Sequence, residues 1–192
     1  MADLTFYFDP ICPWAWRTFL WLREVCKERP LEIDWKLFSL KEINREDTPA
    51  DASDVQIQEP HRALAMARRS GGNEAVERLY VALGQARHER RENLSNESVI
   101  EAAFEEAGLD RSLVRRALDD QSIYEEAAAD HRESVQSYDA FGVPWLVLNG
   151  QRFGFLGPII SEVPQGPAAL ELWEHTAWFL AQPGFYEIKR SR

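Results

Sequence analysis

A strand-like run at residues 4–8 stops at Asp9-Pro10, and a segment with apolar side chains at helical spacing begins at Pro13. The run is rich in aromatic and β-branched residues, which is typical of a strand. Residues 31–38 alternate apolar and polar side chains over most of their length, as in a half-buried strand. The first 38 residues therefore predict strand, helix and strand, and such a connection within one sheet favours a right-handed parallel crossover.

Cys12 stands where the first strand gives way to the helix, and Pro13 follows it. At a helix N-terminus, the unpaired backbone N–H groups and the positive end of the helix dipole favour a thiolate over a thiol. Cysteines in such positions have pKa values well below the free value of about 8.5. Proline suits the next position because no N–H is needed there. We predict that Cys12 is a reactive nucleophile; the alternative is a buried, inert cysteine.

Ala15 occupies the position three residues after Cys12, where a second cysteine would be close enough to bridge to it. The other cysteine, Cys26, lies about 21 Å further along the same helix by its rise. A disulfide needs Cα atoms within about 7 Å, so Cys26 cannot resolve Cys12 and is interpreted as core or partly buried surface. What remains is monothiol chemistry, in which a small external thiol releases the adduct on Cys12. The sequence leaves open whether Ala15 is native or an engineered replacement of a cysteine.

The composition changes in the middle of the chain. From about residue 54 to residue 140 it is rich in Ala, Glu, Arg and Leu at helical spacing, with no strand signal, which predicts four or five helices. Gly71-Gly72 ends one of these helices, and Asn73 can cap the next. The preceding residues 41–53 are polar and are interpreted as a linker.

Two short strands are predicted after the helices, at residues 145–148 and 151–155, because Asn149-Gly150 between them is a strong hairpin signal. A final helix opens at Gly166-Pro167. The whole order predicts an α/β chain with a thioredoxin fold and a helical domain inserted after the second strand. The predicted domains are a thioredoxin-like domain of residues 1–53 and 141–192 and a helical domain of residues 54–140.

Pro144 precedes the first hairpin strand and is a candidate cis-proline, since X-Pro bonds adopt cis at modest cost. In this architecture its turn lies against the thiol, and the backbone of Val143 can pair with an extended thiol ligand. Trp14, Trp16 and Trp145 flank the thiol and can form an apolar wall for an aromatic substrate. The other tryptophans are predicted to fill the core or an interface: Trp21, Trp35, Trp173 and Trp178.

The four histidines show no convincing metal-ligand spacing. Two of them stand beside arginines in the helical region, as His61-Arg62 and Arg87-His88. These residues form either a cationic cluster facing Cys12, which binds the carboxylate of a small thiol or stabilises the thiolate, or solvated helix faces. The remaining histidines, His131 and His175, are predicted at the surface.

Taken in order, the motifs resemble the thioredoxin-fold family that contains DsbA-like oxidoreductases, kappa-class glutathione transferases and 2-hydroxychromene-2-carboxylate isomerases. Within it, the chain looks closest to the actinobacterial mycothiol-dependent nitroreductases. The matching segments are Asp9-Pro10-Ile11-Cys12-Pro13-Trp14 with Trp16, Leu83-Gly84 with Arg87-His88, Phe155-Leu156-Gly157-Pro158, Trp173 and residues 185–190.

The resemblance implies a pocket between the thioredoxin core and the helices. It also implies mycothiol as a reducing co-substrate, with no tightly bound cofactor. The nitroreductase group normally has a cysteine at the position of Ala15, so any step that needs a second cysteine is in doubt. Related transferases and isomerases often have serine at the position of Cys12 and activate a bound thiol instead, so Cys12 indicates redox chemistry.

The formal net charge of −10 argues against nucleic acid and anionic membrane as main partners, since both need basic patches. No stretch reaches the roughly 18–20 apolar residues of a membrane span, and the N-terminus does not resemble a secretory signal. We expect a cytoplasmic protein that acts on small molecules; a homodimer is left open.

The leading prediction is a thiol–disulfide oxidoreductase that uses Cys12 and a low-molecular-weight thiol to reduce a disulfide or a nitroaromatic compound. One alternative is a transferase or isomerase that holds its thiol cofactor without a redox cycle. The other is an impaired form that only binds its substrate.

Overall fold

The computed structural model describes residues 2–46 and 54–191, so residues 47–53 of the predicted linker lie outside the described residues. Its first elements are β1 (Leu4–Phe8), α1 (Pro13–Glu28) and β2 (Ile33–Leu37). β1 and β2 pair in parallel along their whole length. The predicted strand, helix and strand are therefore confirmed.

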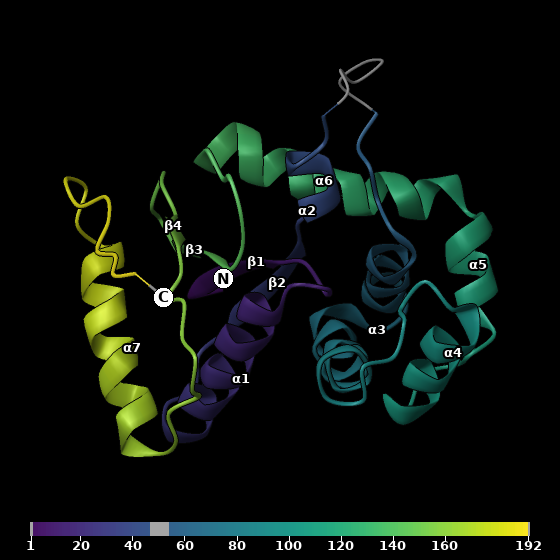
Figure 1. Cartoon of the computed structure of the whole chain (residues 1–192), viewed down its shortest axis with the longest axis horizontal. Helices are drawn as coiled ribbons and strands as arrows, with labels where there is room; N and C mark the ends of the chain where they lie inside the picture. The colour runs from purple at the N-terminus through teal and green to yellow at the C-terminus, as the bar shows by residue number, and fades with distance from the viewer. Residues whose placement is uncertain (1, 47–53, 192) are drawn as a thin grey trace.

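Two further strands complete a mixed sheet around β1. β3 (Trp145–Leu148) pairs antiparallel with β1, and β4 (Phe155–Leu156) pairs antiparallel with β3, which gives the order β2-β1-β3-β4. α1 and α7 (Pro167–Leu180) pack against each other on one side of the sheet, and α6 (Gln121–Tyr138) crosses the other side (Figure 1). This is the thioredoxin-type order that the sequence predicts.

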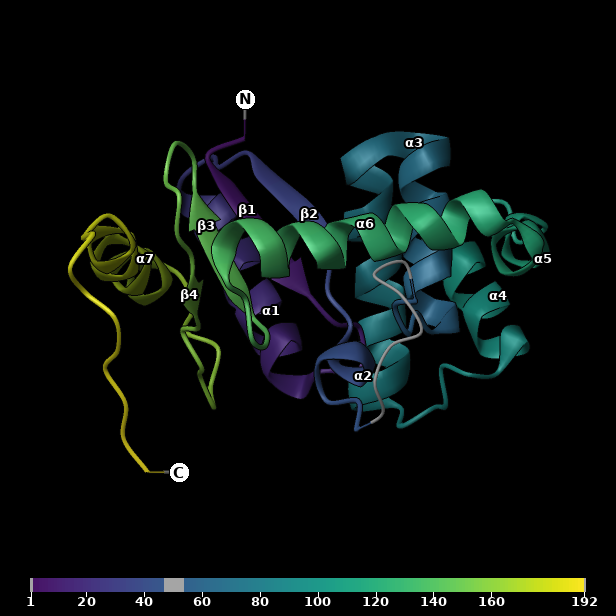
Figure 2. The same cartoon turned by 90° about the horizontal axis from the view of Figure 1, so that it is seen from above.

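A run of helices separates β2 from β3. They are α2 (Leu40–Ile43), α3 (Glu59–Gly84), the π-helix η1 (Gln85–Glu89), α4 (Glu97–Glu106), α5 (Leu113–Asp119) and α6. α3 packs against α4, α5 and α6, and Figure 2 shows α6 running from above the sheet out to α5. The predicted helical region is present, and its status as a separate domain stays a prediction. The sequence analysis did not predict α2, a single helical turn that begins at Leu40 and extends into the predicted linker.

Glycines stand at two departures from regular secondary structure, one inside α3 and one before β4. Gly71 and Gly72 interrupt α3 with non-helical backbone angles, as predicted, and Gly72 has a φ of 68°. The predicted strand at residues 151–155 is wrong in extent, because the strand is only β4 and residues 151–154 are not in a strand. Gly154 packs so closely on Trp145 that a Cβ there would lie 2.2 Å from the indole nitrogen. Only a residue without a Cβ fits beside this indole.

Side chains from the helices cover the outer edge of β2. Asn73, just after the interruption of α3, accepts from the backbone N–H of Trp35 at 2.9 Å and donates to the carbonyl of Ile33. Asp130 of α6 accepts from the backbone N–H of Leu37 at 3.0 Å. Backbone groups that an edge strand would leave open are therefore satisfied by the inserted helices.

Side-chain burial contradicts the prediction for His131 and separates Trp178 from the core tryptophans. His131 was expected at the surface, but it is only 4% exposed, because α6 is covered by β2 on one side and α3 on the other. His175 is exposed, as predicted. Trp178 of α7 is 60% exposed and does not fill the core. The other three tryptophans of that group are buried, as predicted: Trp21, Trp35 and Trp173.

Among the residues that the structure describes, no helix combines the length and apolar character that a bilayer crossing requires. Within the same residues, no group of three or more His, Cys, Asp or Glu side chains is placed to hold a metal ion.

Candidate active site

Cys12 is the N-cap residue of α1, with Pro13 in the first turn. Its Sγ accepts a hydrogen bond from the backbone N–H of Ala15 at 3.4 Å, and the thiol donates to the carbonyl oxygen of Val143 at 3.7 Å. Cys12 is only 4% exposed and belongs to the buried hydrophobic cluster, but these two polar backbone groups lie beside its sulfur and the adjacent Pro13 is exposed. The N–H donor suits a sulfur that ionises, because it stabilises the thiolate.

The turn between α6 and β3 lies against this sulfur. Its Val143–Pro144 peptide bond is cis, as the sequence predicts, and the Val143 carbonyl contacts Cys12. A second loop is also tied to α1, because the hydroxyl of Thr18 donates to the carbonyl of Pro158 at 2.9 Å. Segments from the C-terminal part of the chain are thereby held at the start of α1.

Asp9 is fully buried and organises the loop that leads into α1. Its Oδ1 accepts from the backbone N–H of Ile11 at 2.9 Å, which forms an Asx turn, and its Oδ2 accepts from that of Leu40 at 2.7 Å. Its own carbonyl accepts from the N–H of Cys12 at 3.0 Å. Sequence reasoning missed this role. Asp-Pro at a strand end indicates a turn, but the bond to Leu40 joins residues far apart in the chain.

His61 of α3 lies beside Asp9 and is fully buried. Its Nε2 is 3.0 Å from the carbonyl of Phe38 and 3.5 Å from Oδ2 of Asp9. Burial alone would lower the pKa of His61, but the charge of Asp9 and the two hydrogen bonds outweigh it, so the pKa is raised. His61 therefore links α3 to the active-site loop.

Trp16 joins the helices to the active-site loop. Gly84 lets its indole pack directly on the end of α3, because a Cβ at that position would lie 2.2–2.6 Å from three Trp16 ring atoms. His88 of η1 stacks on the same indole, with ring centroids 5.9 Å apart, and its Nε2 is 3.1 Å from the carbonyl of Pro10. These contacts explain why the segment Leu83-Gly84 with Arg87-His88 has a glycine and a histidine at these positions: both pack on the indole of Trp16.

The environment of His88 contains two cations. Burial lowers the pKa of His88, the bond to Pro10 opposes this, and the charges of Arg87 and Arg17 lower it further. Sequence reasoning missed Arg17, whose guanidinium carbon lies 5.0 Å from the ring centroid of Trp14. The signal was available, since side chains three residues apart on a helix face each other.

The three tryptophans predicted around the thiol lie at different depths. Trp14 is half-buried, whereas Trp16 and Trp145 are buried. Phe141 is 65% exposed and stands edge-on to Trp145, with ring centroids 5.2 Å apart. Aromatic side chains therefore border the turn beside the sulfur, and their contact with a substrate stays a prediction.

The Arg62 side chain contacts α5 and α6. Its guanidinium donates to the carbonyls of Ala117 at 2.9 Å and Asp120 at 3.2 Å, and it lies over the ring of Tyr124. These contacts fix α3 against the C-terminal end of α5. The predicted role of Arg62 in thiol binding gains no support from them.

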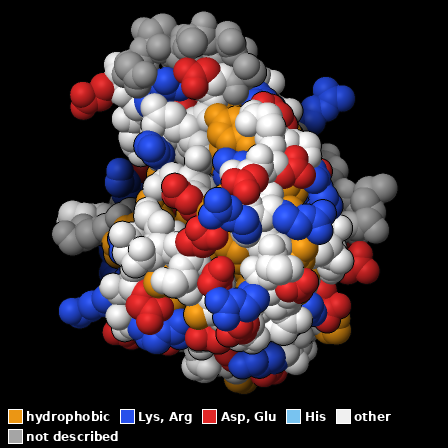
Figure 3. Space-filling model, turned by 90° about the vertical axis from the view of Figure 1, so that its right-hand side faces the viewer, with side chains coloured by type: hydrophobic (Ala, Val, Ile, Leu, Met, Phe, Trp, Pro, Cys, Tyr) orange, Lys and Arg blue, Asp and Glu red, His pale blue; other side chains and the backbone are white. Residues whose placement is uncertain are grey.

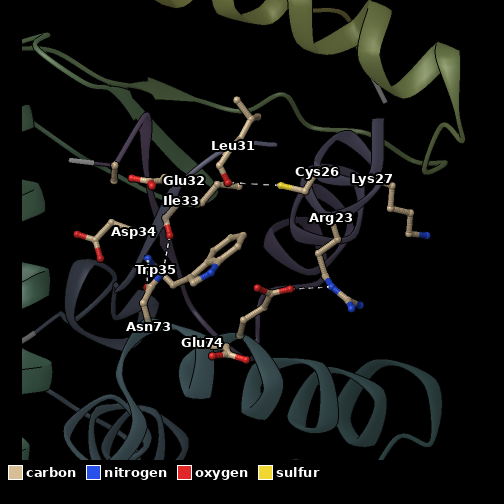
Figure 4. A pocket seen from close by; sticks show the side chains of 12 residues that line it. Arg23, Cys26, Lys27, Leu31, Glu32, Ile33, Asp34, Trp35, Asn73 and Glu74 are labelled. Carbon is tan, nitrogen blue, oxygen red and sulfur yellow. Dashed lines mark hydrogen bonds and ion pairs between the residues drawn. The ribbon is translucent and has the colours of Figure 1, made fainter. Parts of the chain in front are cut away.

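A groove of about 810 Å³ lies beside the C-terminal half of α1, lined by residues such as Arg23, Cys26 and Trp35 and not by Cys12 (Figure 4). The thiol of Cys26 donates to the carbonyl of Leu31 at 3.9 Å, and burial raises its pKa. Cys26 is half-buried, as predicted. The second cysteine is therefore remote from Cys12 and favours its protonated form.

A family model and one curated relative match nearly the whole of this chain. The family model described as "Rv2466c-like: Mycothiol-dependent nitroreductase Rv2466c" matches residues 11–190. Among curated proteins, the uncharacterized protein Rv2286c of Mycobacterium tuberculosis (strain ATCC 25618 / H37Rv) is 31% identical over 195 residues. That match covers 100% of this chain and 83% of the relative.

Three solved structures share the fold. The probable DsbA oxidoreductase SCO1869 from Streptomyces coelicolor has a TM-score of 0.67 at 18% identity, over 98% of this chain and 94% of that one. A 2-hydroxychromene-2-carboxylate isomerase has a TM-score of 0.62 at 18% identity, over 91% and 94% of the two chains. The cytosolic disulfide reductase DsbM from Pseudomonas aeruginosa with GSH has a TM-score of 0.61 at 13% identity, over 91% and 98%.

Proposed function

This chain belongs to the Rv2466c-like family of mycothiol-dependent nitroreductases, which makes it a thiol-dependent oxidoreductase, and we propose that Cys12 is its nucleophile and mycothiol its reducing co-substrate. The substrate is a small disulfide or an electron-poor aromatic compound such as a nitroaromatic. Ala15 makes the chemistry that of a single protein thiol.

The position of the Cys12 sulfur carries the proposal. It lies at the N-terminus of α1, 3.4 Å from the N–H of Ala15 and 3.7 Å from the carbonyl of Val143. The N–H group and the helix dipole stabilise the thiolate. Once the thiol has lost its proton, the Val143 carbonyl no longer accepts from sulfur and is free to accept from an extended thiol ligand.

With a disulfide substrate, the Cys12 thiolate attacks one sulfur. A bond forms between the two sulfurs, the substrate S–S bond breaks, and the second sulfur leaves as a thiolate. A mycothiol thiolate then attacks the substrate sulfur of the mixed disulfide and returns Cys12 as a thiolate.

With a nitroaromatic substrate, two thiols supply two electrons and two protons. One nitro oxygen leaves as water, the nitroso compound forms, and two molecules of mycothiol end as one disulfide. Cys12 takes part as the protein half of an intermediate mixed disulfide.

Ala15 makes release of the adduct depend on an external thiol. Ala15 is fully buried and has no sulfur, and Cys26 is fourteen residues along the same chain from Cys12. The mixed disulfide on Cys12 should therefore accumulate when mycothiol is absent.

Turnover of a disulfide and of a nitroaromatic with mycothiol as reductant tests the proposal. Cys12→Ser should reduce turnover to background, and Cys26→Ser, the matched control, should keep the wild-type rate. Ala15→Cys should shorten the lifetime of the mixed disulfide, since it places a resolving thiol one helical turn away.

Mass spectrometry after incubation with oxidised mycothiol separates the remaining outcomes. A reducible adduct on Cys12 is expected. Equal rates for wild type and Cys12→Ser, with no adduct, would overturn the proposal in favour of an enzyme that activates a bound thiol. Turnover seen only with Ala15→Cys would instead identify an impaired form that binds its substrate.

A further inference from the structure

Two arginines from different elements border the active-site loop. Arg17 is on α1 and Arg87 is on η1, next to His88. The guanidinium carbon of Arg17 lies 5.0 Å from the ring centroid of Trp14, and this arginine is half-buried. His88 stacks on the indole of Trp16 with ring centroids 5.9 Å apart, so η1 is held against α1 one residue away from each arginine. Burial lowers the pKa of His88, and the charges of Arg87 and Arg17 lower it further. Two positive charges therefore converge beside the loop that carries the nucleophile.

Neither arginine has a carboxylate within ion-pair distance among residues 2–46 and 54–191. Arginines on the outer face of the helices are different: Arg111 pairs with Glu101 and Arg115 with Asp119. Figure 3 shows acidic and basic side chains interspersed over that face. The whole chain has 32 acidic and 22 basic residues, so carboxylates outnumber cations. Two neighbouring arginines without a carboxylate partner are therefore unexpected in this chain.

The buried carboxylate of the loop has other hydrogen-bond partners. Asp9 also acts on His88, but it is fully buried. Its two oxygens already accept backbone N–H groups, from Ile11 at 2.9 Å and Leu40 at 2.7 Å. Arg87, in contrast, is exposed, so its charge faces an incoming molecule.

We propose that Arg17 and Arg87 form a subsite for an anionic group, such as a carboxylate, on the oxidised substrate. The enzyme then selects acidic disulfides or acidic nitroaromatics. This inference rests on the proposed function, because it needs an electrophile that Cys12 attacks.

The chemistry of the two partners assigns the subsite to the substrate. Mycothiol is an N-acetylcysteine amide of an uncharged sugar conjugate and has no carboxylate for an arginine to bind. A guanidinium binds a carboxylate through charge-assisted hydrogen bonds that are often bidentate. Arg17 is held on the indole of Trp14, so part of the entropy cost of fixing its side chain is met before the substrate arrives.

Two disulfide probes test the subsite. 5,5′-Dithiobis(2-nitrobenzoate) carries carboxylates, and 2,2′-dithiodipyridine is uncharged. The Cys12 thiolate attacks one sulfur of either probe, the aryl thiolate leaves and is followed by absorbance, and a mixed disulfide remains, so no reductant is needed. Cys12→Ser measures the background reaction of Cys26.

The readout is the ratio of the two second-order rate constants, anionic over neutral. Any change in the ionised fraction of Cys12 affects both reactions equally and cancels in this ratio. We expect Arg17→Gln and Arg87→Gln each to lower the ratio about tenfold, and Arg17→Lys to retain most of it. Arg29→Gln is the matched control, since Arg29 is an exposed arginine at the other end of α1. High salt should reduce the wild-type ratio.

Two outcomes would overturn the subsite alone: an unchanged ratio in both glutamine variants, or an equal fall in Arg29→Gln, which would assign the preference to general charge. If neither probe reacts with Cys12 in the wild-type protein, the proposed function fails and the subsite fails with it.

Discussion

Acidification should destabilise this protein through one buried histidine, His131. Burial lowers its pKa to about 4, although the nearby carboxylates of Glu42 and Asp9 oppose this. Its Nδ1 accepts a hydrogen bond from the backbone N–H of Ser39 at 3.2 Å. A protonated ring cannot accept that bond, so the folded state holds His131 neutral.

The size of the effect follows from the two pKa values. In the unfolded chain the imidazole has its ordinary pKa of about 6.5. Below that pH the unfolded state binds a proton that the folded state does not, so stability falls as the pH decreases towards the folded pKa of about 4. One pKa unit corresponds to about 1.4 kcal/mol, so His131 costs about 2 kcal/mol at pH 5 and about 3 kcal/mol at pH 4.

Urea unfolding of wild type and His131→Asn over a series of pH values measures this cost. Asparagine keeps an acceptor near the position of Nδ1 but does not titrate. Between about pH 7 and pH 5, the difference in unfolding free energy should therefore shift by about 2 kcal/mol in favour of the variant.

Most carboxylates titrate equally in both proteins, so their effect cancels in the difference. His175→Asn, a change at an exposed histidine, should follow the wild type. Parallel profiles for wild type and His131→Asn would refute the argument from burial.

Three further predictions concern contacts of the inserted helices. Gly84→Ala places a methyl group 2.2–2.6 Å from Trp16 ring atoms and should lower the unfolding free energy by about 1–3 kcal/mol, seen as a lower Tm. Gly184→Ala, with no atom within 4 Å, should leave the Tm nearly unchanged, and equal Tm shifts would contradict the packing argument. Asn73→Ala leaves two backbone groups of β2 unpaired and should cost about 1–3 kcal/mol, with faster amide exchange in β2; unchanged exchange would argue against this role. The raised pKa of His61 contributes stability that is complete below about pH 6.5 and is lost as the pH rises through the folded value. His61→Gln should remove this alkaline decline from a pH series of Tm values, and a persistent decline would locate its cause elsewhere.

Features encoded in neighbouring residues could be predicted from the sequence. Cys12 as the N-cap follows from an apolar run, two prolines and a helical pattern in one segment. The place of Pro144 at the start of a strand made it a candidate for a cis bond, and the bond is cis. The helical region between β2 and β3 follows from composition.

Contacts between distant segments could not be predicted, because each depends on a partner that the sequence does not specify. The packing of Trp16 on Gly84 is one case, and the bond from Leu40 to Asp9 is another. The surface prediction for His131 failed for the same reason. α6 is rich in polar residues, but its two sides are covered by β2 and α3. The prediction for Arg62 depended on a distant partner as well. Its guanidinium binds backbone carbonyls at the end of α5, and the sequence does not specify this contact.

The arrangement at the border of the sheet limits how copies of this protein can associate. A strand from a second molecule finds backbone groups of β2 already taken by Asn73 and Asp130. The opposite border is β4, and its two residues are too few to template a lasting ladder. Fibril growth by strand addition is therefore disfavoured at both borders.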